Sequence, residues 1–151
     1  MSDNNYFLSS FLGICILVVG CSTTAVEHRN QVCFPQSCVN VQIVQKIEEL
    51  TRGLQFRKSL ARNAGMLFVF SQMSTHPFWM KDTFIPLDMI WLDEDQKIVY
   101  IARQVPPCTK DPCPTYGPTT ASRYVLEVNT GYADELGLRV GTRAEFKFFE
   151  K

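Results

Sequence analysis

The sequence predicts one mainly β domain of α+β type, a compact β-sandwich or partly open β-barrel with two short helices. Its 151 residues, 46% of them hydrophobic, are enough for a single core. Six or more short segments have the period-two alternation or the short apolar run of a strand, and turn-forming residues separate them. Only two brief segments have a helical pattern, and this combination is typical of small β-rich folds.

The first predicted strands follow directly from the pattern of apolar residues. Residues 39–45 alternate apolar and polar side chains, and residues 65–70 form a continuous apolar run of strand length. Residues 86–92 and 97–105 flank the acidic turn "DEDQ", so we expect them to pair as a hairpin.

The other expected elements are shorter. Residues 46–56 predict a helix with Ile47, Leu50 and Leu54 on one face and Gly53 near its end. A second short helix is expected later in the chain, and a proline-rich stretch is expected to be a structured loop. The remaining predicted segments are strands at 78–83, 122–129 and 142–149, a loop at 106–122 and a helix at 131–138.

The N-terminus predicts export and lipid anchoring. The apolar run at 11–19 is shorter than the ~20 residues of a membrane-spanning helix, so residues 1–20 are interpreted as a signal peptide. The following "VVGC" resembles a lipobox, in which Cys21 is lipidated and becomes the first mature residue. Acyl chains on Cys21 would anchor the protein to a membrane. Residues 21–38 then form a polar linker and 39–151 the domain.

The expected location is the periplasmic side of the cell envelope. Ser22 after the lipidated cysteine resembles the pattern of lipoproteins sent to the outer membrane. A conventional secretory signal with an incidental Cys21 is the alternative, and an n-region that carries Asp3 but neither lysine nor arginine favours it. Nucleic acid is not expected as a partner, because 15 basic and 15 acidic residues balance and no basic run occurs.

Four cysteines of the mature chain form two equally spaced pairs, Cys33 with Cys38 and Cys108 with Cys113. Each pair spans a proline, so a local disulfide is geometrically plausible, and an exported domain meets an oxidising environment. A four-cysteine zinc site is the alternative. We expect two disulfides and no metal or cofactor.

Several stretches resemble the bacterial and archaeal family known as domain of unknown function 192. They are "GLQFRKSL", "GMLFVF", "HPFWMKDTFIPLDMIWLD", "PPCTKDPCPTY" and "RYVLEVNTGYADELGL", and the similarity runs from Val39 to Phe149. The resemblance implies a compact β-rich barrel or sandwich with small helices and no established activity. The family usually has Met at Gln55 and Asn at Asp82, and an ionised carboxylate only accepts hydrogen bonds where an amide also donates.

The stretch "HPFWMKDT" is the first candidate for a site. As a strand it would place Trp79, Lys81 and Thr83 on one side, an aromatic ring beside an ammonium and a hydroxyl. An ordinary strand with a snorkelling lysine has the same composition. His76 is either a ligand, a titrating switch or a loop residue. Nearby methionines allow a copper(I) site, although methionine in apolar strands is more often core filling.

Charged residues in apolar strands are the second candidate. Asp88 lies among apolar neighbours and must be exposed, paired or protonated, with Lys81, Arg57 and Arg123 as candidate partners. In "SRYVLEVN", one strand face carries Arg123, Glu127 and Asn129, which indicates either solvent or a polar pocket.

These observations predict the binding of a small polar or anionic molecule. Trp79 is the expected stacking surface, Lys81 and Arg123 are the expected anion contacts, and the acidic residues act as acceptors or internal partners. The predicted ligand-binding residues are His76, Trp79, Lys81, Asp82, Asp88 and Arg123.

Two other functions remain open. The chain could be a protein-interaction module of the envelope. It could also be a hydrolase, since Asp82, Asp88 and Glu127 offer paired carboxylates, but no nucleophile motif assigns a catalytic residue.

Overall fold

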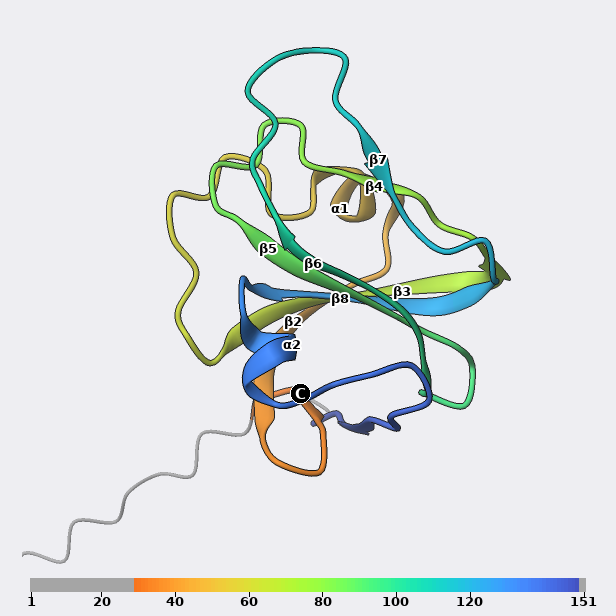
Figure 1. Ribbon diagram of the computed structural model, residues 1–151. Coiled ribbons are helices and arrows are strands. Elements are labelled where there is room, and N and C mark those ends of the chain that lie inside the picture. Colours follow the sequence, from red (N-terminus) through yellow and green to blue (C-terminus); the bar gives the residue numbers. More distant parts are fainter. Residues whose placement is uncertain (1–28, 150–151) are drawn as a thin grey trace, which may run out of the picture.

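The computed structural model describes residues 29–149 and consists of a curled seven-stranded sheet, a two-stranded ribbon and two short helices (Figure 1). The elements are β1 Gln31–Cys33, β2 Cys38–Val44, α1 Ile47–Arg52, β3 Ala64–Ser74, β4 Phe78–Trp79, β5 Leu87–Leu92, β6 Ile98–Val105, β7 Thr115–Tyr116, β8 Ser122–Asn129, α2 Tyr132–Glu135 and β9 Glu145–Lys147. The predicted mainly β fold with two short helices is confirmed.

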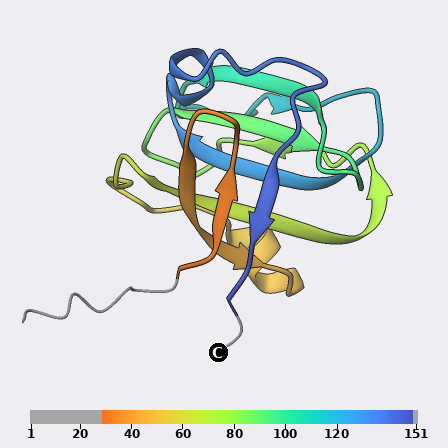
Figure 2. The ribbon, with the colours of Figure 1, turned by 90° about the horizontal axis from the view of Figure 1, so that it is seen from below.

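The strand order in the large sheet is β6-β5-β8-β3-β2-β1-β9, and β4 pairs with β7 in the ribbon. Only β2 and β3 are parallel within the sheet, because the chain between them crosses over through α1. Figure 2 shows β1 lying between β2 and the C-terminal strand β9.

The C-terminal segment links the two edges of the sheet. Before it enters β9, residues 142–144 run beside the start of β6, where the amide of Ala144 donates to Gln96 and that of Ile98 to Thr142, both at 2.9 Å. The same chain then pairs with β1 at the opposite edge. One end of the curled sheet is therefore closed, which gives the partly open barrel expected from the sequence.

Apolar side chains fill both faces of the central strands, and the two helices lie on opposite sides of them (Figure 1). All six residues of β5 are buried because its two sets of alternating side chains enter different cores. The core on the α1 side includes Phe68, Met89 and Trp91. The core on the α2 side includes Leu67, Ile90 and Leu126.

Several predicted elements are confirmed with small boundary shifts. The strand at 122–129 coincides with β8, and the predicted hairpin is the antiparallel pair of β5 and β6. Both predicted disulfides are present, with Cys33 bonded to Cys38 and Cys108 to Cys113. Among residues 29–149, no helix is long and apolar enough to cross a membrane.

Four expectations differ from the structure. The strand expected over 78–83 ends at Trp79, because Met80 begins a turn that it closes by accepting the amide of Thr83 at 3.2 Å. Part of the expected linker, residues 31–33, is strand β1. The proline-rich loop contains β7. Finally, α1 buries none of its side chains and Ile47 is 70% exposed, since a helix of six residues is too short to pack a full face against the core.

Candidate functional site

A cavity of about 660 Å³ lies between α1, the second half of β3, β8 and the segment that leads into β4. This volume is within the range of small-molecule pockets. Its wall is largely apolar, and five rings contribute to it, those of Phe68, Phe70, His76, Phe78 and Trp79. Polar side chains of serine, threonine and glutamine lie among these rings.

Glu127 is the buried acidic group of this cavity. It lies in β8 directly opposite Met66 of β3 and Met89 of β5, and only 5% of its surface is exposed. Its Oε2 atom has no hydrogen-bond partner among residues 29–149. Desolvation raises the pKa of the Glu127 carboxyl to about 8, since burial disfavours the ionised form. An unpartnered carboxyl at the wall of an apolar cavity is the arrangement expected of a binding group.

Gly53 provides the space above this carboxyl. It ends α1 with a φ of +48°, a conformation that side chains with a Cβ rarely adopt. A Cβ atom at this position would lie 3.1 Å from Cζ of Phe68 and 3.9 Å from Oε2 of Glu127. The glycine therefore allows the helix end to approach the ring and the carboxyl closely.

The aromatic wall is held by specific contacts. Phe68 and Phe78 meet edge to face with ring centroids 4.8 Å apart, and the imidazole of His76 stacks on Phe70 at 3.6 Å. The backbone of His76 has a φ of +41°, and its carbonyl accepts a 2.9 Å hydrogen bond from the buried indole of Trp91. The position of His76 is thus fixed from both its ring and its backbone.

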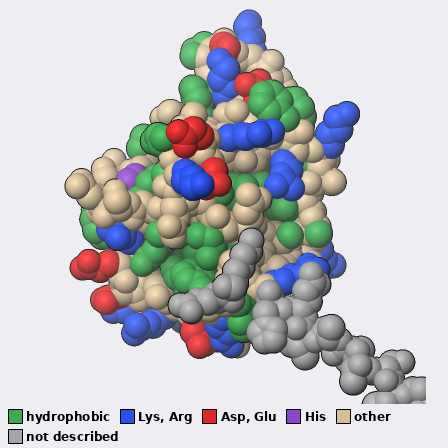
Figure 3. Space-filling model, turned by 180° about the vertical axis from the view of Figure 1, so that it is seen from behind, with side chains coloured by type: hydrophobic (Ala, Val, Ile, Leu, Met, Phe, Trp, Pro, Cys, Tyr) green, Lys and Arg blue, Asp and Glu red, His purple; other side chains and the backbone are tan. Residues whose placement is uncertain are grey.

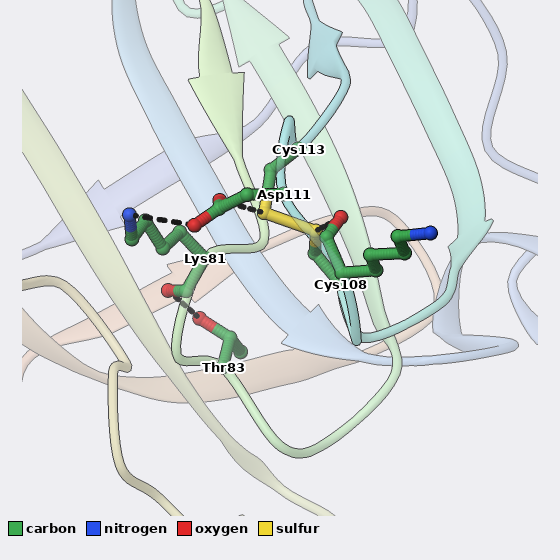
Figure 4. Close-up of a disulfide and its surroundings, with 6 residues drawn as sticks. Lys81, Thr83, Cys108, Asp111 and Cys113 are labelled. Atoms are coloured by element: carbon green, nitrogen blue, oxygen red, sulfur yellow. Dashed lines mark hydrogen bonds and ion pairs between the residues drawn. A yellow bond between two sulfur atoms is a disulfide. The ribbon is translucent and has the colours of Figure 1, made fainter.

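Of the six residues predicted to bind a ligand, His76 and Trp79 line the cavity. Lys81 lies nearby, with Nζ 5.8 Å from the centroid of the Trp79 ring, but its ammonium pairs with Asp111 at 3.3 Å (Figure 4). This pair lies beside the disulfide of Cys108 and Cys113 (Figure 4).

Asp82 and Arg123 serve the backbone around the cavity. The carbonyl of Asp82 accepts the amide of Phe56 at 2.7 Å, and its φ is +56°. Aspartate and asparagine adopt this left-handed conformation more readily than most residues with a Cβ atom. The guanidinium of Arg123 donates to the carbonyl of Ser71, a residue of the cavity wall.

Asp88 is on the opposite face of the sheet, and the cationic partners suggested from the sequence are wrong. One carboxylate oxygen accepts the amide of Gln104 and the other accepts the amide of Ala133, both at 2.8 Å. Gln104 is in a bulge of β6, where two residues oppose one on β5, and Ala133 is in the first turn of α2. Asp88 therefore satisfies two backbone groups and holds α2 against the sheet.

Glu127 is an available carboxylate in the sequence, but the six predicted binding residues do not include it. Its signal is a single acidic residue between Leu126 and Val128, on the strand face that also carries Arg123 and Asn129. Whether the polar face met solvent or a pocket depended on α1 and β4, which are remote in sequence. Of the two alternatives for this polar strand face, solvent or a pocket, the side chain of Glu127 lies at a pocket.

The chemistry available to the cavity depends on the state of this carboxyl. As a neutral acid, Glu127 can both donate and accept a hydrogen bond, and beside a cation it can be ionised. No cluster of three or more metal-ligating histidine, cysteine or acidic side chains is present within residues 29–149. The two cysteine pairs, as disulfides, do not form the alternative zinc site.

Comparison with known proteins decides the family. The model of DUF192, described as uncharacterized ACR, COG1430, matches residues 30–146. The chain belongs to this family. The DUF192 match covers all of β1 to β8 and most of β9.

Solved structures show the same fold. A Sinorhizobium meliloti 1021 protein, provisionally described as a transcription regulator, is 28% identical with a TM-score of 0.71, covering 78% of this chain and 92% of that one. A Novosphingobium aromaticivorans DSM 12444 protein of unknown function is also 28% identical, with a TM-score of 0.69 and coverage of 78% and 83%. No curated protein matches this DUF192 chain.

Proposed function

We propose that this protein binds a small organic molecule in the cavity beneath α1, with Glu127 as the polar contact and the surrounding rings as the apolar wall. The observation that carries the proposal is the buried Oε2 of Glu127, which no protein group satisfies in the described part of the chain. Leaving such an oxygen without a partner costs about 1–3 kcal/mol. A ligand atom bonded to it would recover part of that energy.

The composition of the cavity supports the same function. Ligand sites combine an apolar wall with a few polar groups that fix orientation. Here Phe68 and Phe78 form part of the wall, and Trp79 is 48% exposed at its edge. An exposed tryptophan beside a cavity offers a flat surface on which a ligand can stack.

A ligand-observed NMR screen tests this function. Mixtures of neutral, cationic and anionic organic molecules are added to the wild-type protein and to Trp79→Ala. Phe148→Ala is the matched control, since its ring is 49% exposed but lies near the C-terminus, outside the cavity. We expect hits that bind wild type and Phe148→Ala equally and Trp79→Ala at least about fivefold more weakly, about 1 kcal/mol. Equal binding to all three proteins would contradict a site in this cavity.

The same proposal includes a location. Cys21 lies outside the described residues, and we propose that it carries the lipid that attaches the domain to the periplasmic side of the envelope, in the outer membrane. The two disulfides support an oxidising compartment. Membrane fractionation and intact mass of wild type and Cys21→Ser test the anchor. A Cys21→Ser protein that stays in the membrane, and whose mass differs from wild type only by the exchange of sulfur for oxygen, would refute it.

An interaction module is the second candidate function. Phe56 and Phe84 form an edge-to-face pair with centroids 6.2 Å apart, and both rings are more than half exposed. Exposed aromatic pairs of this kind are common in protein interfaces. Side chains of both charge signs are interspersed on the face seen in Figure 3, which does not favour a nucleic-acid partner.

A further inference from the structure

The charged groups around the cavity indicate which ligand charge it accepts. Glu127 is the buried titratable group of the described lining, while Arg52 lines the cavity from an exposed position on α1. The two expected anion contacts are engaged elsewhere, Lys81 with Asp111 and Arg123 with the carbonyl of Ser71. Neither Lys81 nor Arg123 is therefore part of the cavity wall to pair with an anionic ligand. An anion in the cavity would instead lie against the acidic side chain of Glu127, which disfavours its binding.

Rings surround the remaining space. The faces of aromatic rings attract cations, and the attraction grows when water is excluded. Phe78 meets both Phe68 and Phe70 edge to face, so the face of its ring points in a different direction from theirs. The Trp79 ring already has a cation nearby, since the ammonium of Lys81 lies 5.8 Å from its centroid.

We propose that the ligand is a small organic cation, whose ammonium or trimethylammonium group lies among these rings and forms an ion pair with the Glu127 carboxylate. This inference rests on the proposed function of the cavity. It narrows the ligand from any small organic molecule to one with a positive charge.

Binding of such a cation is coupled to a proton. Because burial raises the pKa of Glu127 to about 8, the carboxyl is mostly neutral at pH 7 and loses its proton to solvent when the cation binds. The other titratable groups of the lining are Arg52 from α1 and His76 from the loop before β4. The facing positions on β3 and β5 are Met66 and Met89, which do not titrate.

Choline and its uncharged isostere 3,3-dimethyl-1-butanol provide the test. They have nearly the same shape and differ in charge, and neither changes its charge between pH 6 and 9. Calorimetric titration of the disulfide-bonded protein at pH 8 is expected to show choline binding more than about tenfold tighter than the alcohol. Equal affinities would overturn the proposal of a cationic ligand but would still agree with a cavity that binds small molecules. If choline showed no binding at concentrations up to about 10 mM, the proposal of a cationic ligand would also be overturned. The NMR screen tests separately whether the cavity binds small molecules at all.

Glu127→Gln tests the pairing. This variant keeps the shape of the side chain, and its fold is checked by the near-ultraviolet circular dichroism of the buried Trp91. We expect the preference for choline over the alcohol to fall to about twofold or less. A preference that persists in Glu127→Gln would refute the ion pair. Exposed Glu135→Gln is the control and is expected to behave as wild type.

The pH dependence gives an independent readout. Choline affinity is expected to rise by up to about tenfold from pH 6 to pH 7 and to level off above pH 8, with one proton released per cation bound at low pH. His76→Asn is measured in parallel, so that the contribution of His76 can be subtracted. A flat profile in both proteins would contradict the coupling. Phosphatidylcholine vesicles that bind more tightly than free choline would identify a lipid headgroup as the source of the same cation.

Discussion

The two buried carboxylates of the sheet have opposite environments. Asp88 faces α2 and gives each oxygen to a backbone amide, of Gln104 and Ala133. Glu127 faces α1, and its Oε2 atom has no hydrogen-bond partner within the described part of the chain. Both are acidic residues in apolar strands, and both are almost fully buried. Burial alone therefore does not assign a role to an acidic residue. The carboxylate of Asp88 stabilises the fold, whereas the carboxyl of Glu127 is available to a bound ligand.

The contrast extends to the elements around each carboxylate. On the α2 side, Arg103 pairs with Asp134 at 2.7 Å and donates to the carbonyl of Leu138, so the helix is tied to β6 at several points. On the α1 side, the helix buries none of its own side chains. A cavity occurs where the covering helix is short and poorly packed.

Replacing Asp88 is expected to have the largest effect. Asp88→Ala leaves the buried amide of Ala133 and the partly buried amide of Gln104 without their partner, and we expect the free energy of unfolding to fall by about 4 kcal/mol in urea denaturation. Asp134→Ala, which removes an exposed partner of Arg103, is the control and should cost less than about 1 kcal/mol. If Asp88→Ala were as stable as this control, the structural role of Asp88 would be wrong.

The stability contributed by neutral Glu127 should depend on pH. The pKa is about 8 in the folded protein and 4.5 when unperturbed, so the folded state holds a proton that the unfolded state releases between these values. Stability is therefore fully present below about pH 4.5 and is lost as pH rises to about 8, at up to about 1.4 kcal/mol per pH unit and by roughly 3.5 kcal/mol between pH 5 and pH 8. We expect Glu127→Gln to remove this loss, as measured by urea denaturation from pH 5 to 8. Identical slopes in the two proteins would exclude the raised pKa.

Gly53→Ala sharpens the comparison at the cavity. Its positive φ and the 3.1 Å approach of the new Cβ to Phe68 predict a loss of about 2 kcal/mol in unfolding free energy. Gly137→Ala is the matched control, since it has a φ of +58° and open space, and should cost about 1 kcal/mol. The difference between the two thermal melts measures the contact beneath α1. No difference would mean that this contact is absent.

Lys81→Ala is expected to have the smallest effect. Lys81 pairs with Asp111 and not with Asp88, and both of its ion-pair side chains are exposed by 40% or more. Such a pair contributes less than about 0.5 kcal/mol. Lys97→Ala, from a similarly exposed pair with Asp95, is the control in the same thermal melt. If Lys81→Ala melted at a much lower temperature than Lys97→Ala, the ammonium of Lys81 would have to neutralise a buried acid in the wild-type protein.

The sequence alone determined much of the fold. Period-two alternation predicted the strand at 122–129 and which of its polar side chains share a face, because a strand places successive side chains on opposite sides whatever packs on them. The turn "DEDQ" predicted the pairing of β5 and β6, and the cysteine spacing predicted both disulfides. These features depend on residues close together in the sequence, so the local sequence is enough to predict them.

The tertiary structure decided the site. Local pattern extended the β4 strand to Thr83, whereas contacts of Met80 and Asp82 with distant backbone turn the chain there. Pattern also showed Asp88 and Glu127 to be acids in apolar strands without separating them. Their roles differ because α2 brings an amide to Asp88, while α1 and the ribbon strand β4 enclose space above Glu127. Hydrogen-bond partners and enclosed volume depend on residues far apart in the chain, and only the folded arrangement specifies them.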